Sequence, residues 1–139
     1  MGQLAEAKYH FQQGLTFATV GRIDEGIQEF TAAVDRDPTY AAAYGNRGMA
    51  YMLQKKKYNK ALDDLNSAIR LDPKDRNAFY NLAALRTLRQ EFDLAIDALD
   101  QALKRGFNNY ESLRRDADLE GLRGQPEFRR LLERHKISL

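Results

Sequence analysis

The sequence predicts an all-α protein in which three antiparallel helix pairs are stacked and a C-terminal segment of further helices caps the last pair. Two observations lead to this prediction. Landmark residues return every 34 or 35 positions through roughly the first 105 of the 139 residues, and a fixed period of this length is the signature of a repeat protein. Within each period, apolar residues recur at the spacing of an amphipathic helix.

The repeat is clearest at two prolines. Pro38 and Pro73 lie 35 residues apart, and each follows an amphipathic stretch. A proline at this place ends one helix and can open the next. Four further sets keep the same rhythm: Gly14, Gly48 and Ala83; Gly26, Ala61 and Ala95; Phe30, Leu65 and Leu99; Ala33, Ala68 and Ala102. These sets place one extra residue between Gly48 and Ala61, and we assign it to the turn at 54–57, where an insertion disturbs no packed face.

Each period is interpreted as two helices joined by a short turn. The predicted helices are 3–19, 23–36, 40–53, 58–71, 75–89 and 92–104. Small residues fall where the two helices of a pair must approach each other, with Gly14 matched to Gly26 and Gly48 matched to Ala61. We therefore expect close packing within each pair at these positions.

The C-terminal segment, residues 106–139, does not repeat. Gly106 follows two cations and is typical of a helix C-terminus. Asn108 or Asn109 is expected to cap one short helix, Asp118 another, and Pro126 to open the last helix. We expect the segment to cover the exposed face of the third pair, as solenoid caps do. The apolar residues assigned to this contact are Phe107, Leu119, Phe128 and Leu131.

Each period also carries large, small and aromatic residues at fixed offsets. They are Tyr44, Arg47, Gly48, Tyr51, Ala61, Leu65, Ala68 and Pro73 in the second period; His10, Gln13, Gly14, Phe17, Gly26, Phe30, Ala33 and Pro38 in the first; and Phe79, Leu82, Ala83, Arg86, Ala95, Leu99 and Ala102 in the third, with Phe107 in place of the proline. The pattern resembles the signature of the tetratricopeptide repeat. The resemblance implies a right-handed α-solenoid with repeats at about 7–40, 41–75 and 76–105, followed by a capping segment at 106–139.

Four polar residues depart from the family pattern. His10 and Gln13 replace apolar residues in the first repeat only, which suits an end of the stack that faces solvent. Arg47 and Arg86 take positions that are usually apolar or aromatic. We expect their long side chains to lie over apolar surface with the charge in water.

The resemblance implies a non-catalytic scaffold for protein–protein interaction, with a concave groove lined by the first helix of each pair. The candidate groove residues are Lys8, Phe11, Gln12, Leu15, Asn46, Met49, Asn77, Tyr80, Asn81 and Ala84. Matching positions hold Gln12, Asn46 and Asn81, and their amides both donate and accept, which suits the backbone of an extended peptide. The alternative is that asparagine is simply common at this position in the family.

One subtype of the family can be compared residue by residue. Repeat proteins that grip the C-terminal carboxylate of heat-shock chaperone tails use a clamp of lysine, arginine and asparagine in this groove. The matching positions here are Phe11, Leu15, Asn46, Asn77 and Asn81. Only Asn46 fits the clamp, so the sequence argues against that function.

Enzyme, metal and cofactor motifs are absent from the sequence. There is no cysteine, and the two histidines, His10 and His135, stand at opposite ends of the chain without ligand-spaced partners. No glycine-rich phosphate loop occurs. The lysine run at 55–57 is interpreted as a solvated loop. The paired acids, interpreted as helix caps or exposed faces, are Asp63 with Asp64 and Asp72 with Asp75.

The charge balance favours a protein or peptide partner over nucleic acid. The net charge is +2; residues 1–103 carry 13 basic and 14 acidic residues, and residues 104–139 carry 9 and 6. No apolar run is long enough for a membrane helix and the first residues do not form a signal peptide, so we expect a cytoplasmic location. We expect a monomer. A self-assembling structural module, or a homo-oligomer, stays an alternative, and so does an RNA-binding helical repeat, which the basic C-terminal segment favours and the near-neutral repeats oppose.

Overall fold

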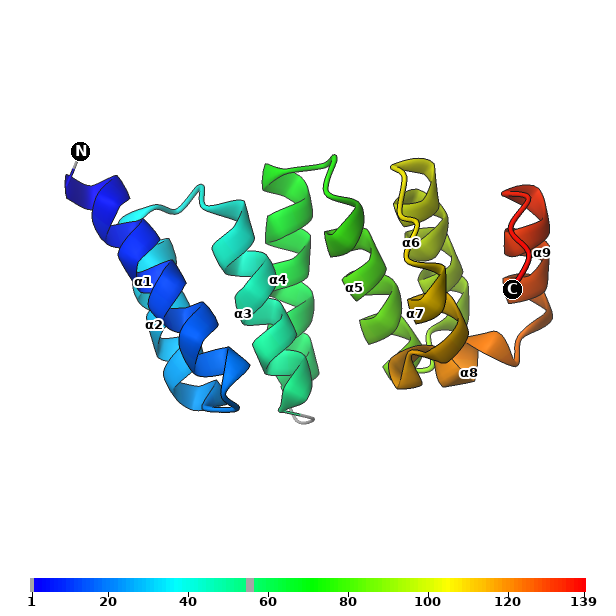
Figure 1. The fold of residues 1–139 in the computed structure, drawn as a ribbon, viewed down its shortest axis with the longest axis horizontal. Helices are drawn as coiled ribbons and strands as arrows, with labels where there is room; N and C mark the ends of the chain where they lie inside the picture. Colours follow the sequence, from blue (N-terminus) through cyan, green and yellow to red (C-terminus); the bar gives the residue numbers. More distant parts are fainter. Residues whose placement is uncertain (1, 55–56) are drawn as a thin grey trace. The chain divides into compact units, whose positions relative to one another are not determined.

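The computed structural model describes residues 2–54 and 57–139, with side chains from residue 4 onward, and every regular element in these ranges is helical. The first six helices are α1 (Gly2–Thr19), α2 (Ile23–Arg36), α3 (Ala41–Leu53), α4 (Tyr58–Leu71), α5 (Arg76–Leu88) and α6 (Phe92–Lys104). They form the three predicted pairs (Figure 1), and the all-α prediction is confirmed. The predicted insertion at 54–57 falls partly on residues 55 and 56, which lie outside the described residues.

Four short elements follow the third pair. They are α7 (Tyr110–Arg115), the 3₁₀ helix η2 (Ala117–Leu119), α8 (Glu120–Arg123) and α9 (Pro126–Arg134). Asn109 caps α7 by accepting a hydrogen bond from the backbone N–H of Ser112 at 3.1 Å. The predicted cap at Asp118 is wrong, because Asp116 accepts the backbone N–H of Asp118 at 2.9 Å and so opens η2 itself.

The chain divides into two compact units, Met1–Pro73 and Lys74–Leu139, called unit 1 and unit 2 below. Unit 1 contains α1 to α4, and unit 2 contains α5, α6 and the C-terminal elements. The third helix pair is thus grouped with the C-terminal segment and not with the first two pairs. The sequence-based division at residues 105 and 106 follows the end of the repeats and stays a prediction.

The core of unit 1 includes the fully buried Phe30 on α2 and Leu65 on α4, each packed against the first helix of its own pair. A Cβ added at Gly14 would lie 2.5 Å from the Phe30 ring, and one added at Gly48 would lie 3.2 Å from Leu65 Cγ. Both distances are shorter than ordinary van der Waals contact, so the two helices of each pair approach closely at these glycines. The close approach that the sequence predicted at the small residues is therefore confirmed for Gly14 and Gly48.

The core of unit 2 extends from the third helix pair into the C-terminal segment. Here α5 packs on α6, η2 and α8 pack on α5, and α8 and α9 pack on α6. The fully buried leucines of unit 2 are Leu85, Leu99, Leu113, Leu119, Leu122 and Leu131, and four of these six belong to the C-terminal segment. The four apolar residues assigned to the capping contact, Phe107, Leu119, Phe128 and Leu131, are all buried.

The described helices include none that is both long and apolar enough to cross a membrane.

Candidate functional site

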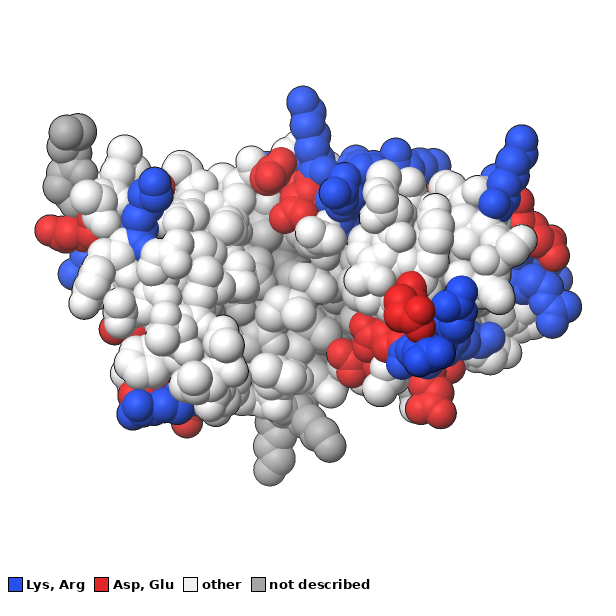
Figure 2. Space-filling view, viewed as in Figure 1, with Lys and Arg blue, Asp and Glu red and all other residues white. Residues whose placement is uncertain are grey.

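In unit 1, the first helices of the two pairs present an open face with apolar side chains, called the α1/α3 face below. Phe11 and Leu15 on α1 are half-buried, whereas Met49 on α3 is 40% exposed. The Phe11 ring leans on the Tyr40 ring, with 5.0 Å between centroids. Figure 2 shows this side of α1 and α3 largely uncharged. The face therefore offers apolar contact area on a rigid helical support.

Polar groups border the α1/α3 face. Lys8 and Gln12 are exposed on α1. The Asn46 side chain donates its Nδ2–H to the backbone carbonyl of Ala42 at 2.8 Å, which leaves its oxygen as an acceptor. Next to Lys8, a hollow of about 310 Å³ is lined by Leu4, Lys8, Asp37 and Tyr40. The arrangement suits a bound segment that is mainly apolar and donates a few hydrogen bonds.

In unit 2, the corresponding face of α5 is covered by the C-terminal segment. Tyr80, Ala84 and Thr87 are only 8%, 3% and 5% exposed. The Tyr80 ring stacks on Phe107 with 4.4 Å between centroids, and its hydroxyl donates to Asp116 Oδ2 at 2.5 Å. The prediction that Tyr80 and Ala84 line an open groove is therefore wrong, because the segment folds back along α5. Asn77 remains exposed and Asn81 half-buried.

The contact with Asp116 also affects the protonation of Tyr80. Burial, followed by the hydrogen bond to the Asp116 carboxylate, raises the pKa of Tyr80 well above its ordinary value. Burial and then the charge of Asp116 raise the pKa of Asp118. Tyr80 consequently stays a neutral hydrogen-bond donor at any physiological pH.

The second helix pair is bridged by an ion pair that the sequence did not reveal. Arg47 donates from Nε and Nη2 to the two carboxylate oxygens of Asp64, each at 2.8 Å, and from Nη1 to Thr31 Oγ1 at 3.2 Å. Asp64 is 5% exposed. The hydrogen bond to Asp64 raises the pKa of Arg47 against the opposing effect of burial. The expectation that this guanidinium lies in water is wrong, and so is the interpretation of Asp64 as an exposed or capping acid.

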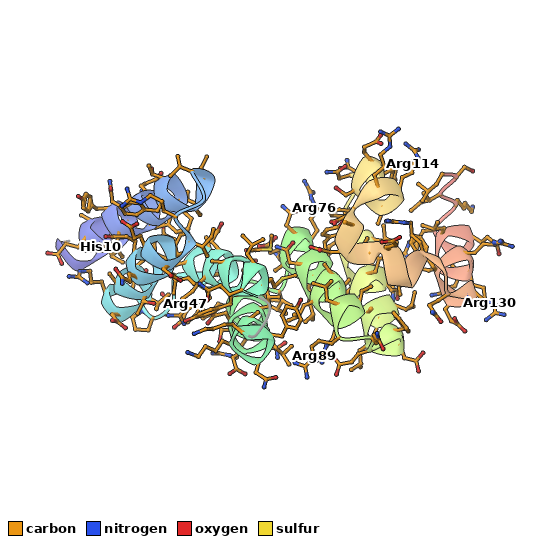
Figure 3. All side chains as sticks on the ribbon, turned by 90° about the horizontal axis from the view of Figure 1, so that it is seen from below. His10, Arg47, Arg76, Arg89, Arg114 and Arg130 are labelled. Atoms are coloured by element: carbon orange, nitrogen blue, oxygen red, sulfur yellow. The ribbon has the colours of Figure 1, made fainter. Side chains whose placement is uncertain are left out.

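Two of the other polar departures, His10 and Arg86, are paired too. His10 Nδ1 lies 2.6 Å from Glu29 Oε2, which joins α1 to α2, and Arg86 donates to Glu91 Oε1 at 2.9 Å in unit 2. Figure 3 labels His10 and Arg47 on unit 1. These ion pairs hold neighbouring helices together.

Three of the six arginines of the C-terminal segment have acidic partners. Arg114 and Arg115 both contact Glu111, at 3.1 and 2.7 Å, and Arg130 lies 3.5 Å from Glu127. Arg114 and Arg130 point outward from the helices in Figure 3, and Figure 2 shows acidic and basic side chains intermixed over this part. The mixture favours a solvated surface over a binding site for an anion.

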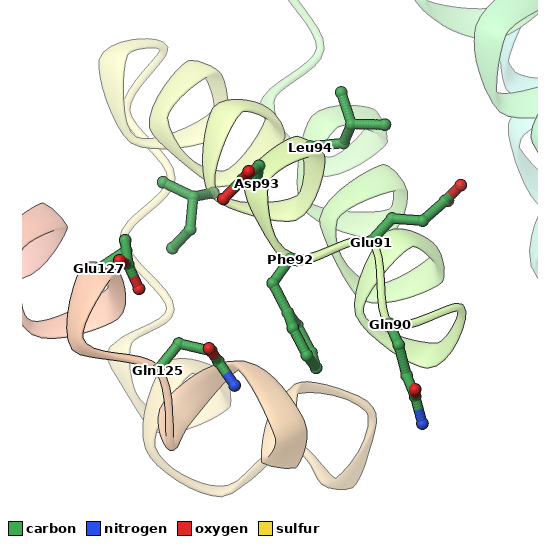
Figure 4. Close-up of a pocket in the computed structure, with 8 residues that line it drawn as sticks. Gln90, Glu91, Phe92, Asp93, Leu94, Gln125 and Glu127 are labelled. Carbon is green, nitrogen blue, oxygen red and sulfur yellow. The ribbon is translucent and has the colours of Figure 1, made fainter.

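A pocket of about 410 Å³ lies in unit 2 where α6 and α9 begin (Figure 4). Its lining consists of Gln90, Glu91, Phe92, Asp93, Leu94, Ile96, Gln125 and Glu127. Phe92 lies against the helix α8, since a Cβ added at Gly121 would be 3.3 Å from its ring. Within the ranges that the structure describes, no three acidic, histidine or cysteine side chains are grouped to hold a metal ion.

Comparisons with known proteins agree with the helix-pair architecture. The tetratricopeptide repeat family model matches residues 11–75 and 53–111. Tetratricopeptide repeat protein 36 of Caenorhabditis elegans is 46% identical over 68 residues, which are 48% of this chain and 37% of that protein. Hsp70-Hsp90 organizing protein 3 of Arabidopsis thaliana is 26% identical over 102 residues, or 73% of this chain and 18% of that protein. The chain thus spans well under half the length of these relatives.

Solved structures show the same fold. The first repeat domain of Spaghetti (RPAP3), bound to the HSP90 peptide SRMEEVD, superposes with a TM-score of 0.76 at 24% identity, covering 94% of both chains. MamA superposes with a TM-score of 0.72 at 28% identity, covering 94% of this chain and 73% of that one. From the repeat pattern, the three helix pairs and these matches, we conclude that the chain belongs to the tetratricopeptide repeat family.

Proposed function

We propose that the chain is a non-catalytic interaction module that binds a segment of a partner protein on the α1/α3 face. The observation that carries the proposal is the combination on this face of an uncharged surface, a 40% exposed methionine at Met49 and a free amide oxygen at Asn46. Similar domains, such as the first repeat domain of Spaghetti (RPAP3), hold a peptide of another protein, which supports the same class of function here.

Apolar contact would supply most of the affinity. Burial of an exposed side chain the size of Met49 is worth about 1.5–3 kcal/mol, whereas one hydrogen bond to Asn46 adds about 0.5–1.5 kcal/mol net. Methionine adapts its shape to different neighbours. We therefore propose that the face tolerates several apolar residues in the partner, while the amide fixes the register of the bound segment.

The proposed partner is not an acidic chaperone tail. Among the similar structures, the first repeat domain of Spaghetti (RPAP3) is bound to an HSP90 peptide and the second of human RPAP3 to an HSP70 peptide. In this chain the clamp positions hold Phe11 and Leu15 on α1 and the uncharged Asn77 and Asn81 on α5. None of these four side chains is a cation that could pair with a terminal carboxylate, which favours a segment recognised by apolar side chains.

The test begins with capture of a partner from the native host and its identification by mass spectrometry. Binding of that partner is then measured by calorimetry for Met49→Asp and for the matched control Leu94→Asp, a similarly exposed residue on α6 (47%). A charge buried under an apolar partner should weaken binding by at least about tenfold for Met49→Asp, with no change for the control. Unchanged binding by Met49→Asp, together with loss of binding on substitution of Arg129 and Arg134, would move the site to the C-terminal segment.

A further inference from the structure

The groove positions of the third helix pair differ from those of the first two because the C-terminal segment covers them. This segment is called the occupant below. Tyr80 corresponds by repeat position to Phe11, and Ala84 to Leu15 and Met49. In unit 1 these positions are half-buried or exposed, whereas Tyr80 and Ala84 are covered by the chain's own C-terminal segment. The contacts between α5 and the C-terminal segment therefore show how the groove side of such a helix can bind a segment of chain.

The occupant makes three kinds of contact with α5. Phe107 stacks on the Tyr80 ring, the Asp116 carboxylate accepts the Tyr80 hydroxyl hydrogen bond, and Gly121 lies near Thr87, where an added Cβ would be 3.8 Å from Cγ2. One aromatic residue and one carboxylate thus contact Tyr80, and one small residue contacts Thr87, two turns further along α5.

The occupant is held in shape by its own short-range structure. Asp116 also accepts the backbone N–H of Asp118 at 2.9 Å, which starts the 3₁₀ turn that carries Leu119 into the interior. Leu119 and Leu122 follow Asp116 by three and six residues and are fully buried. The recognised pattern is accordingly a carboxylate followed by leucines three and six positions later, on a short helical segment.

We propose that the groove face of α5 is a segment-binding surface whose resident ligand is residues 107–122 of the same chain, and that a helical segment of another protein with the same acid–leucine–leucine spacing competes for it. The proposal rests on the groove binding proposed above and extends it to α5 with a defined ligand chemistry. Other proteins cannot bind the groove face of α5 while residues 107–122 occupy it. Only a segment that displaces these residues can bind there.

Covalent connection gives the resident ligand a large advantage. A segment joined by a short linker acts at an effective concentration in the millimolar range. A free segment with the same sequence, at concentrations on the order of 10 μM, occupies only about one site in a hundred. Weakening the resident copy without changing α5 removes this advantage and exposes the surface to a probe.

The experiment uses a fluorescently labelled synthetic peptide of residues 107–123 as the probe and the full chain as the receptor. In the double variant Leu119→Ala and Leu122→Ala, the resident copy loses two buried leucines, each worth at least about 30-fold in stability, while α5 is untouched. Fluorescence anisotropy should show half-saturation at a peptide concentration at least about tenfold lower than for the parent. The exposed-site variant Arg115→Ala is the matched control and should behave as the parent does.

A second probe separates specific from general binding. The same peptide with Asp116→Ala cannot accept the Tyr80 hydrogen bond and should bind the double variant several-fold more weakly. Equal binding of both peptides, or no gain of binding in the double variant, would overturn the proposal.

Hydrogen exchange on the parent chain keeps the proposal testable if the double variant does not fold. A ligand leaves its site independently, so amides of residues 110–123 should exchange at least about tenfold faster than those of residues 78–102. Equal rates would mean that the segment and the third pair open as one core, which contradicts the proposal.

The result can be told apart from a failure of the proposed function. Met49→Asp changes only the α1/α3 face and should leave peptide binding to the double variant unchanged. If the captured partner is lost in Met49→Asp and the peptide never binds, the α5 proposal fails alone. If the peptide binds and the partner ignores Met49→Asp, the α1/α3 proposal fails alone.

Discussion

The second and third helix pairs differ in how their two helices are held together: the second pair uses a buried ion pair, and the third uses apolar side chains at the same positions. In the second pair, Arg47 and the buried Asp64 form a two-point ion pair between the helices. At the matching positions the third pair has Leu82 and Ala98, and unit 2 adds the buried leucines of the C-terminal segment. One repeat framework therefore accepts either a polar bridge or an apolar contact, provided that both partners match.

The largest expected effect on stability comes from removing the buried leucines that the C-terminal segment adds to unit 2. Truncation after Arg105 deletes Leu113, Leu119, Leu122 and Leu131, all fully buried. Each of these buried leucines contributes about 2–5 kcal/mol to the folded state, so the truncated unit 2 should be much less stable than the parent. Size-exclusion chromatography should show aggregates, because the apolar faces of α5 and α6 become exposed, and circular dichroism should show a lower unfolding temperature. A truncated chain as soluble and heat-resistant as the parent would show that the segment does not stabilise the third pair.

The next largest effect is expected from breaking the ion pair between Arg47 and Asp64 in unit 1. Arg47→Leu leaves the buried Asp64 carboxylate without its cation and should cost about 3–5 kcal/mol in the free energy of unfolding. Adding Asp64→Ala reproduces the residues of the third pair and should restore the stability to the parent value or above. Urea unfolding of the two variants measures both steps. A double variant as unstable as Arg47→Leu would mean that the two pairs are not interchangeable in this way.

A smaller effect is expected at the contact between α5 and the C-terminal segment. Tyr80→Phe keeps the stack on Phe107 but removes the hydroxyl that donates to Asp116. Hydrogen bonds to charged groups are worth about 1.5–3 kcal/mol, and water can reach the half-buried Asp116, so about 1 kcal/mol should be lost. Thermal unfolding gives the value, and Tyr110→Phe, at an exposed tyrosine, should have no effect.

The smallest change in stability should come from the groove amides. Asn46→Ala with Asn81→Ala should alter the free energy of unfolding by less than about 0.5 kcal/mol, because neither amide lies in the core. Affinity for the captured partner should fall by about 0.5–1.5 kcal/mol through the hydrogen bond lost at Asn46, whereas Asn81→Ala alone should leave it unchanged, because the α1/α3 face does not include α5. Lys8 is the only charge among the candidate groove residues, so binding should depend weakly on salt. Strong salt dependence would instead favour the arginines of the C-terminal segment and an anionic partner.

Periodicity predicted the helices and not the contacts of the non-repeating segment. The 34–35-residue rhythm located the first six helices to within two residues at each end, because each helix must turn its apolar stripe inward. The same rhythm placed Tyr80 on the groove face. Phe107 and Asp116 contact Tyr80 from a part of the chain that does not repeat, so the rhythm could not predict where they lie. The sequence therefore did not predict that the C-terminal segment covers the groove face of α5.

The ion pair between Arg47 and Asp64 was missed for a related reason. Each residue has an ordinary explanation when it is considered alone: an arginine lying over apolar surface, and an acid beside another acid. The available signal was their joint departure, since the third repeat replaces them with Leu82 and Ala98. An ion pair between two facing helices can therefore be predicted from the sequence only when both positions are compared across the repeats.

The bridge between Arg47 and Asp64 also limits how such repeats can be recombined. Joining α3 to α6 would set the guanidinium of Arg47 against the methyl group of Ala98, and joining α5 to α4 would set Leu82 against an unpaired Asp64. Either chimera leaves a buried charge without a partner. The helix pair, and not the single helix, is therefore the smallest cassette that can be duplicated, shuffled or grafted into a designed array from this chain.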